Sequence, residues 1–176
     1  TPICNDITVE LDGNGEYTLD QSDIDAIGAG SSDNCTATAN LVLAVLPTDF
    51  DCADVGGNIV TLTVTDDCGN FETCNATVTV EDNMPADITC PADINLNTLP
   101  GECSAEAAWN TTLPTDNCGI LSVVYTAPGI TIVDPGTGLG ISGEFPLGET
   151  TVTMTVTDVN NNVIDCTFTV TVIDNE

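Results

Sequence analysis

Residues 58–83 read NIVTLTVTDDCGNFETCNATVTVEDN and residues 150–175 read TTVTMTVTDVNNNVIDCTFTVTVIDN, and the two stretches align without a gap. In each copy, two runs that alternate between Thr and apolar residues flank a turn rich in Asp and Asn. Alternation with a period of two places Val on one face of a strand and Thr on the other, as in a half-buried strand. Each copy is therefore predicted to be a β-hairpin.

Two shorter motifs recur around this hairpin and divide the chain. Cys4-Asn5-Asp6-Ile7 corresponds to Cys90-Pro91-Ala92-Asp93-Ile94, and Asp33-Asn34-Cys35 returns as Asp116-Asn117-Cys118. After the first hairpin, Pro85 removes a backbone donor and fixes its own φ, so the preceding strand should end there. We expect two modules, residues 1–83 and 84–176, cut from a longer array.

Short segments with strand character follow one another in both modules. In the first we expect strands over residues 6–11, 16–19, 36–46, 58–65 and 71–81, with one helical turn over 22–27 ended by Gly28. In the second we expect strands over residues 93–97, 105–109, 121–126, 129–133, 150–157 and 162–173. Such spacing is typical of an immunoglobulin-like β-sandwich. The predicted fold class is all-β, with two tandem immunoglobulin-like sandwiches stapled by disulfides.

The charge composition excludes several functions. The chain has 176 residues, 28 of them acidic, with no Lys, Arg or His, and its formal net charge is −28. Nucleic-acid binding needs cations to neutralise phosphates, and zinc or acid–base chemistry based on His is excluded. Self-repulsion of this size disfavours a compact state unless bound divalent cations or salt relieve it. Apolar residues nevertheless make up 41% of the chain, which is unlike a disordered acidic tail.

Cysteine usage indicates the compartment. Nine Cys residues sit among turn residues, which favours disulfides in an oxidising environment. There is no apolar run near 18 residues, so no membrane insertion is expected. No signal peptide is visible, so we expect a mature or excised fragment of a secreted protein.

These residues carry a family resemblance. The second module resembles a hyalin repeat (HYR) domain in Cys90-Pro91, Gly101-Glu102-Cys103, residues 115–119 (TDNCG), residues 145–150 (FPLGET) and residues 165–170 (DCTFTV). The first resembles a related immunoglobulin-like module of large Bacteroidetes cell-surface adhesins in residues 11–15 (LDGNG), 22–25 (SDID), 31–35 (SSDNC), 50–52 (FDC) and 62–66 (LTVTD). The resemblance implies an immunoglobulin-like fold in an adhesive or stalk-like extracellular protein, without catalytic activity. The absence of Lys and Arg departs from such modules.

The repeat also suggests the disulfide pairing. Cys74 and Cys166 occupy the same aligned position in the last strand, and Cys4 and Cys90 the same position before the first. The economical pairs are Cys4–Cys74 and Cys90–Cys166, which leaves Cys103 with Cys118 and Cys35 with Cys52. Cys68 is then unpaired, and Cys35–Cys68 and Cys68–Cys74 are competing pairs between which the sequence does not decide.

Oxygen-bearing side chains gather where the modules join. In an immunoglobulin-like sandwich, the loop after the second strand and the last hairpin loop lie at the amino-terminal end. These loops would face the residues that end the first module, and Ca²⁺ prefers such mixed carboxylate and amide oxygens. The predicted ligands are Glu81, Asp82, Asn83, Asp87, Asp116, Asp158, Asn160 and Asn162, with Asp66 and Asp33 in an equivalent half-site of the first module. The alternative is that Asp and Asn only form turns.

A second loop, residues 12–23, places oxygens at several positions of an EF-hand-like calcium loop. Tyr17 stands where that loop needs Gly, and Asp23 where it needs Glu. Asp-Gly-Asn-Gly is also a strong hairpin turn, and this is the default interpretation.

The leading hypothesis is a non-catalytic structural repeat of a secreted, calcium-stabilised bacterial surface adhesin or filament. Its expected partners are the neighbouring repeat modules of the same protein, and other copies of the protein in homotypic filament contacts. The alternative is a module that recognises glycans or ice through a flat Thr face, formed by Thr61, Thr63 and Thr65 with Thr151, Thr153 and Thr155. An enzyme is not expected, because no pair of carboxylates has an evidently divergent environment.

Overall fold

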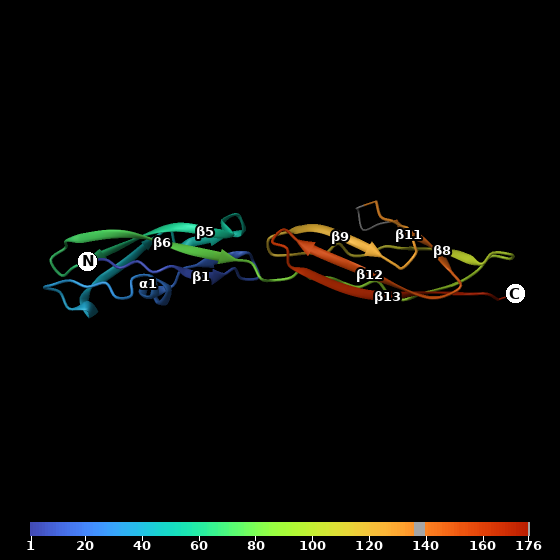
Figure 1. Ribbon diagram of the computed structural model, residues 1–176, viewed down its shortest axis with the longest axis horizontal. Helices are drawn as coiled ribbons and strands as arrows, with labels where there is room; N and C mark the ends of the chain where they lie inside the picture. Colours follow the sequence, from blue (N-terminus) through green and yellow to red (C-terminus); the bar gives the residue numbers. More distant parts are fainter. Residues whose placement is uncertain (136–139, 176) are drawn as a thin grey trace. The chain divides into compact units, whose positions relative to one another are not determined.

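The computed structural model describes residues 1–135 and 140–175, and the chain forms two compact units, Thr1–Asn83 and Met84–Glu176 (Figure 1). This is the division that the repeat predicts. Each unit has a buried apolar core of its own.

The first unit is built on a four-stranded sheet in the order β1-β6-β5-β3. Its strands are β1 (Ile7–Glu10), β6 (Phe71–Glu81), β5 (Gly56–Thr65) and β3 (Val42–Leu46), and β1 runs parallel to β6. Val60, Leu62 and Val64 of β5 are buried, whereas Thr61 between them is exposed, as the alternation predicts.

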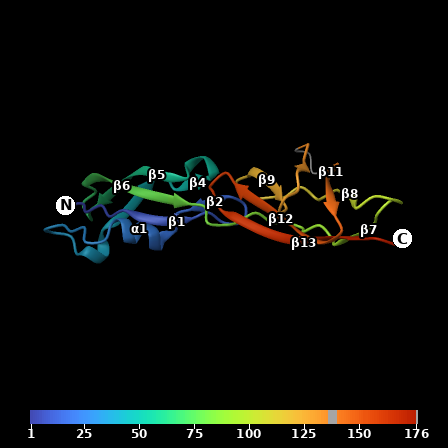
Figure 2. The same cartoon turned by 45° about the vertical axis from the view of Figure 1, so that its right-hand side comes forward.

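A helix and a two-stranded ribbon complete the first unit. The helix α1 (Gln21–Ile27) is capped by Asp20, whose carboxylate accepts from the backbone N–H groups of Ser22 and Asp23. The ribbon pairs β2 (Glu16–Thr18) with β4 (Asp49–Asp51), which lie close together in Figure 2. The strand expected over residues 36–46 is shorter, because the 3-10 turn η1 (Thr38–Asn40) occupies its first part and only β3 remains. A second 3-10 turn, η2 (Cys52–Asp54), follows β4.

The second unit is a sandwich of two sheets, in the orders β7-β13-β12-β9 and β10-β11-β8. This is the predicted immunoglobulin-like arrangement. The first sheet contains β7 (Ile94–Asn97), β13 (Val163–Ile173), β12 (Gly148–Asp158) and β9 (Ile120–Thr126), with β12 and β13 side by side in Figure 1. The second contains β10 (Ile132–Val133), β11 (Ile141–Pro146) and β8 (Ser104–Trp109).

An aromatic cluster fills the core of the second unit. Trp109 is 7% exposed and packs edge-on against Phe168, with ring centroids 5.2 Å apart, and against Tyr125 at 5.8 Å. The predicted core role of Trp109 is confirmed. The strand β11 was not expected, because Gly143 and Pro146 lower its strand propensity and its pairing with β8 supplies the order.

The two copies of the hairpin share one register. Val60 pairs with Ala76 in the first unit, and the aligned residues Val152 and Phe168 pair in the second. An Asp before the first strand accepts from the last strand in both units: Asp6 from the Thr77 N–H and Asp93 from the Thr169 N–H, each at 2.7 Å.

Two of the predicted disulfides are present. Cys4–Cys74 and Cys90–Cys166 tie the start of each unit to its last strand. The predicted pairs Cys35–Cys52 and Cys103–Cys118 are wrong, because Cys35 and Cys103 carry free thiols.

The ends of the long strands explain both errors. Cys35 lies beside the turn that follows β5, since Thr36 contacts Asp67, whereas the turn η2 that begins at Cys52 leads into the start of β5. Likewise, the Cys103 carbonyl accepts from Leu147 just before β12, whereas Cys118 adjoins Gly119, which contacts the end of β12. A strand of ten residues spans roughly 30 Å, far beyond the reach of a disulfide.

Within the described ranges, no helix is long and apolar enough to cross a membrane.

Candidate metal centre

The turn between β12 and β13 is organised by one buried carboxylate. Asp158 ends β12 and is 0% exposed. Its Oδ1 accepts from the backbone N–H groups of Asn160 at 2.8 Å and Asn162 at 2.9 Å, and its Oδ2 accepts from Asn162 Nδ2 at 2.8 Å. An Asp that binds the backbone two and four residues on is a strong local turn signal. The sequence therefore folds this turn around Asp158.

A second turn brings Asp116 beside it. Asp116 Oδ1 accepts from the backbone N–H groups of Cys118 at 2.9 Å and Gly119 at 2.8 Å. The two turns are joined directly, because the Val159 N–H donates to the Gly119 carbonyl at 3.1 Å. Carboxylate oxygens of Asp116 and Asp158 lie within 4.8 Å of each other. Gly119 was not among the predicted site residues, although the motif DNCG contains it.

Two oxygens of these turns have no hydrogen-bond donor among the described residues. Within the described part of the chain, Asp116 Oδ2 and Asn160 Oδ1 are buried and accept no hydrogen bond. Two carboxylates this close repel each other, and a buried charge is normally paired or bound to a metal. No side-chain cation exists to pair them, since the chain has no Lys, Arg or His. An all-oxygen set of carboxylate and amide groups suits a hard cation such as Ca²⁺.

The other predicted ligands of the second unit play supporting roles. Asp87 is exposed and shapes the site through its backbone, which exchanges hydrogen bonds of 2.8 and 3.2 Å with Thr115. The Asn162 amide nitrogen donates both to Asp158 Oδ2 and to the Met84 carbonyl. Asn162 therefore orients the carboxylate of Asp158.

Three predicted ligands belong to the end of the first unit. Asn83 Nδ2 donates to Glu10 Oε1 and to Glu81 Oε2, each at 3.2 Å, and Asp82 is 5% exposed. The prediction that Glu81, Asp82 and Asn83 share a site with the second unit stays a prediction.

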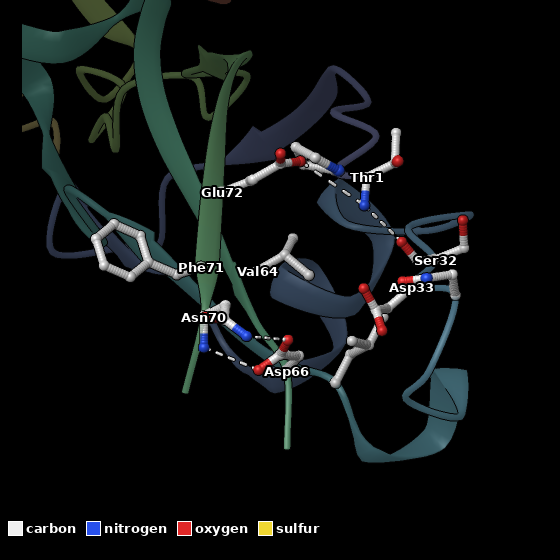
Figure 3. A pocket seen from close by; sticks show the side chains of 11 residues that line it. Thr1, Ser32, Asp33, Val64, Asp66, Asn70, Phe71 and Glu72 are labelled. Carbon is white, nitrogen blue, oxygen red and sulfur yellow. Dashed lines mark hydrogen bonds and ion pairs between the residues drawn. The ribbon is translucent and has the colours of Figure 1, made fainter. Parts of the chain in front are cut away.

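The first unit repeats the same pair of turns. Asp33 Oδ1 accepts from the Cys35 and Thr36 N–H groups, and Asp66 Oδ1 accepts from the Cys68 and Asn70 N–H groups, all at 2.8 Å. Both carboxylates line one pocket, in which Asn70 bonds to Asp66 (Figure 3). The backbone donors lower the pKa of the Asp33 carboxyl, and the Asn70 side chain lowers the pKa of the Asp66 carboxyl.

Cys68 stands in the first unit where the second has Asn160. The buried amide oxygen of Asn160 therefore has no counterpart in the first unit. Asp33 and Asp66 provide a poorer set of metal ligands.

The loop 12–23 forms a turn and a helix cap. Asp12 Oδ1 accepts from the Asn14 and Glu16 N–H groups at 2.8 and 3.1 Å. Asp20 and Asp23 form the capping box of α1. The hairpin-turn interpretation is the one that the structure favours.

The Thr faces of the two units point outward. Thr61 and Thr151 are exposed and Thr63, Thr65, Thr153 and Thr155 are half-buried, opposite the buried Val face of each strand. This orientation is the one expected of a solvated sheet, and no further observation connects it with glycan or ice binding.

Comparison with known proteins gives one family match. The family model described as "HYR domain" matches residues 81–172, which is more than half of the chain. The chain is also 33% identical over 100 residues to the Sushi, von Willebrand factor type A, EGF and pentraxin domain-containing protein 1 of Mus musculus and to that of Rattus norvegicus. The match covers 57% of the chain but 3% of the length of these curated relatives.

Among solved structures, immunoglobulin domains 1–4 of Sidekick-1 match 97% of the chain and 47% of the matched structure, with a TM-score of 0.43 and 10% identity. Human Protocadherin-24 EC1-2 matches 96% of the chain and 95% of the matched structure, with a TM-score of 0.36 and 15% identity.

Proposed function

Because the chain belongs to the HYR domain family through residues 81–172, we propose that it is a non-catalytic structural repeat of a secreted adhesin or filament, stabilised by Ca²⁺ in its second unit. The residues that would hold the ion are Asp116, Asp158 and Asn160. Neighbouring modules of the same protein would be its partners. The bacterial surface setting rests on the sequence motifs, since the relatives in the comparison come from mouse and rat.

One observation carries the calcium proposal. The Asp158 carboxylate is fully buried within 4.8 Å of the Asp116 carboxylate, in a chain without Lys, Arg or His. A bound metal ion would offset the repulsion between these two carboxylates, for which the chain has no cationic side chain. A divalent ion also suits the buried Oδ1 of Asn160, which accepts no hydrogen bond from the described residues and would serve as a further oxygen ligand.

The consequence for a repeat protein is mechanical. The two turns that meet at Val159 and Gly119 connect different strands of the sandwich, and an ion between their carboxylates would hold them together. The Cys90–Cys166 disulfide ties the first strand of this unit to the last. Ion and disulfide together would take the place of salt bridges between side chains, which a chain without Lys, Arg or His cannot form.

The test is calcium binding by the full chain. Protein stripped with a chelator and titrated with CaCl₂ in a calorimeter should bind Ca²⁺, and its thermal midpoint should rise with free calcium as linkage requires. Magnesium is the matched control, because its smaller and stricter octahedral shell suits this set of ligands poorly. A midpoint and calorimetric trace that ignore calcium would overturn the calcium proposal.

A further inference from the structure

Two free thiols lie at the same end of the first unit. Cys35 and Cys68 are both exposed and unbridged. Cys35 follows the Asp33 turn after α1, and Cys68 lies in the turn between β5 and β6. The two Asp residues that organise these turns, Asp33 and Asp66, line one pocket (Figure 3). The turns are therefore neighbours in space although 33 residues apart in the chain.

Direct bonds connect the residues next to the two thiols. The Asp67 N–H donates to Thr36 Oγ1 at 3.3 Å, and Asn40 Nδ2 donates to Asp67 Oδ2 at 3.3 Å. Thr36 follows Cys35 and Asp67 precedes Cys68, and adjacent Cα atoms are about 3.8 Å apart. A disulfide joins Cα atoms about 4.4 to 6.8 Å apart, a range that neighbours of a bonded pair can reach.

Both backbones are already held in place. The Cys35 N–H donates to Asp33 Oδ1 and the Cys68 N–H donates to Asp66 Oδ1, each at 2.8 Å. Such bonds reduce the conformational freedom that ring closure would otherwise cost. The competing partner Cys74 is bonded to Cys4, and Cys52 lies at the other end of β5.

We propose that Cys35 and Cys68 form a structural disulfide of the first unit in addition to Cys4–Cys74, closed by thiol–disulfide exchange in an oxidising compartment. One thiolate attacks a low-molecular-weight disulfide and releases a thiol, and the other then attacks the mixed disulfide and releases the second thiol. The two cysteines lose two electrons and two protons, and the small disulfide is reduced to two thiols. In the second unit Asn160 takes the place of Cys68, so this bridge does not recur there.

Peptide mapping of the full chain tests the proposal. The protein is equilibrated with oxidised and reduced glutathione, alkylated with N-ethylmaleimide and digested without reduction by an endoproteinase that cuts after Asp and Glu. Trypsin is unsuitable, because the chain has no Lys or Arg. Peptides 34–49 and 68–72 should appear as one linked species, lighter than their sum by two hydrogens, while Cys103 carries the label.

Two variants sharpen the test. In Cys35→Ser, Cys68 should become fully labelled, and in Cys68→Ser, Cys35 should become fully labelled, each rising from almost no label in the wild type. Linkage of Cys68 to any other cysteine, a dimer linked between chains, or full labelling of both thiols in the oxidised wild type would overturn the proposal. The wild-type map stands even if a variant folds poorly.

Discussion

Replacing Asp158 by Asn should change the stability of the second unit in opposite directions with and without calcium. Without a metal, the ionised carboxylates of Asp158 and Asp116 lie within 4.8 Å of each other. Their repulsion is on the order of 3 kcal/mol at an effective dielectric constant of about 20. The substitution removes this repulsion, so the variant should gain stability in chelator.

Part of this gain in stability is offset, because the substitution also weakens the hydrogen bonding of the turn between β12 and β13. An Asn at position 158 keeps one oxygen that accepts from the backbone of Asn160 and Asn162, but its amide nitrogen cannot accept from Asn162 Nδ2. That lost hydrogen bond costs about 1 kcal/mol. The net gain in chelator should therefore be about 2 kcal/mol. At calcium concentrations about a hundredfold above Kd, the wild type gains about 2.7 kcal/mol that the variant does not, which reverses the order.

Urea unfolding followed by tryptophan fluorescence measures this. The single tryptophan, Trp109, is buried in the core of the second unit and reports on that unit. The control is Asp93→Asn, because Asp93 lies in the unit on which Trp109 reports and its carboxylate also accepts from a backbone N–H, that of Thr169 at 2.7 Å. The control should show the same small change in both buffers.

Two outcomes would contradict the reasoning. If Asp158→Asn is no more stable than the wild type in chelator, the carboxylates do not repel each other as ionised neighbours. If calcium stabilises the variant as much as it stabilises the wild type, the ion is bound elsewhere.

Three further predictions concern the second unit. Replacing both Cys90 and Cys166 by Ser should lower the unfolding free energy by about 4 kcal/mol in urea, since the bridge closes a loop with a sequence separation of 76. Phe145→Ala should cost about 4 kcal/mol in the same assay, because the ring is fully buried against Trp109. The Thr169 N–H donates to the Asp93 carboxylate and lowers the pKa of this carboxyl below 3.8. The stability that the ionised Asp93 contributes is therefore complete above pH 3.8 and is lost as the pH falls through the lower pKa of the folded state. In Asp93→Asn, urea midpoints measured over a pH series should show a smaller loss of stability in acid.

Most of the fold could be predicted because its signals are local. Alternating Thr and Val residues define the two hairpins, which contain Val60 and Val152. The aligned residues of the two hairpins also pair in the same strand register. The Asp158 turn and the α1 cap also form between residues a few positions apart. Strands that depend on their partner were missed, as β11 was, because Gly143 and Pro146 weaken its local signal.

The sequence by itself determined that the chain is all-β, that it consists of two repeated modules, and that no side-chain cation balances its negative charge. Composition, alternation and turn-forming residues can be read from neighbouring positions, and these features depend on nothing else. Only the tertiary structure decided which distant groups meet. It separated Cys103 from Cys118 by the length of β12, and it brought the carboxylates of Asp116 and Asp158 within 4.8 Å. The physical reason is that the distance between two loops depends on which end of a long strand each loop occupies. The amino-acid composition of a loop does not indicate that end.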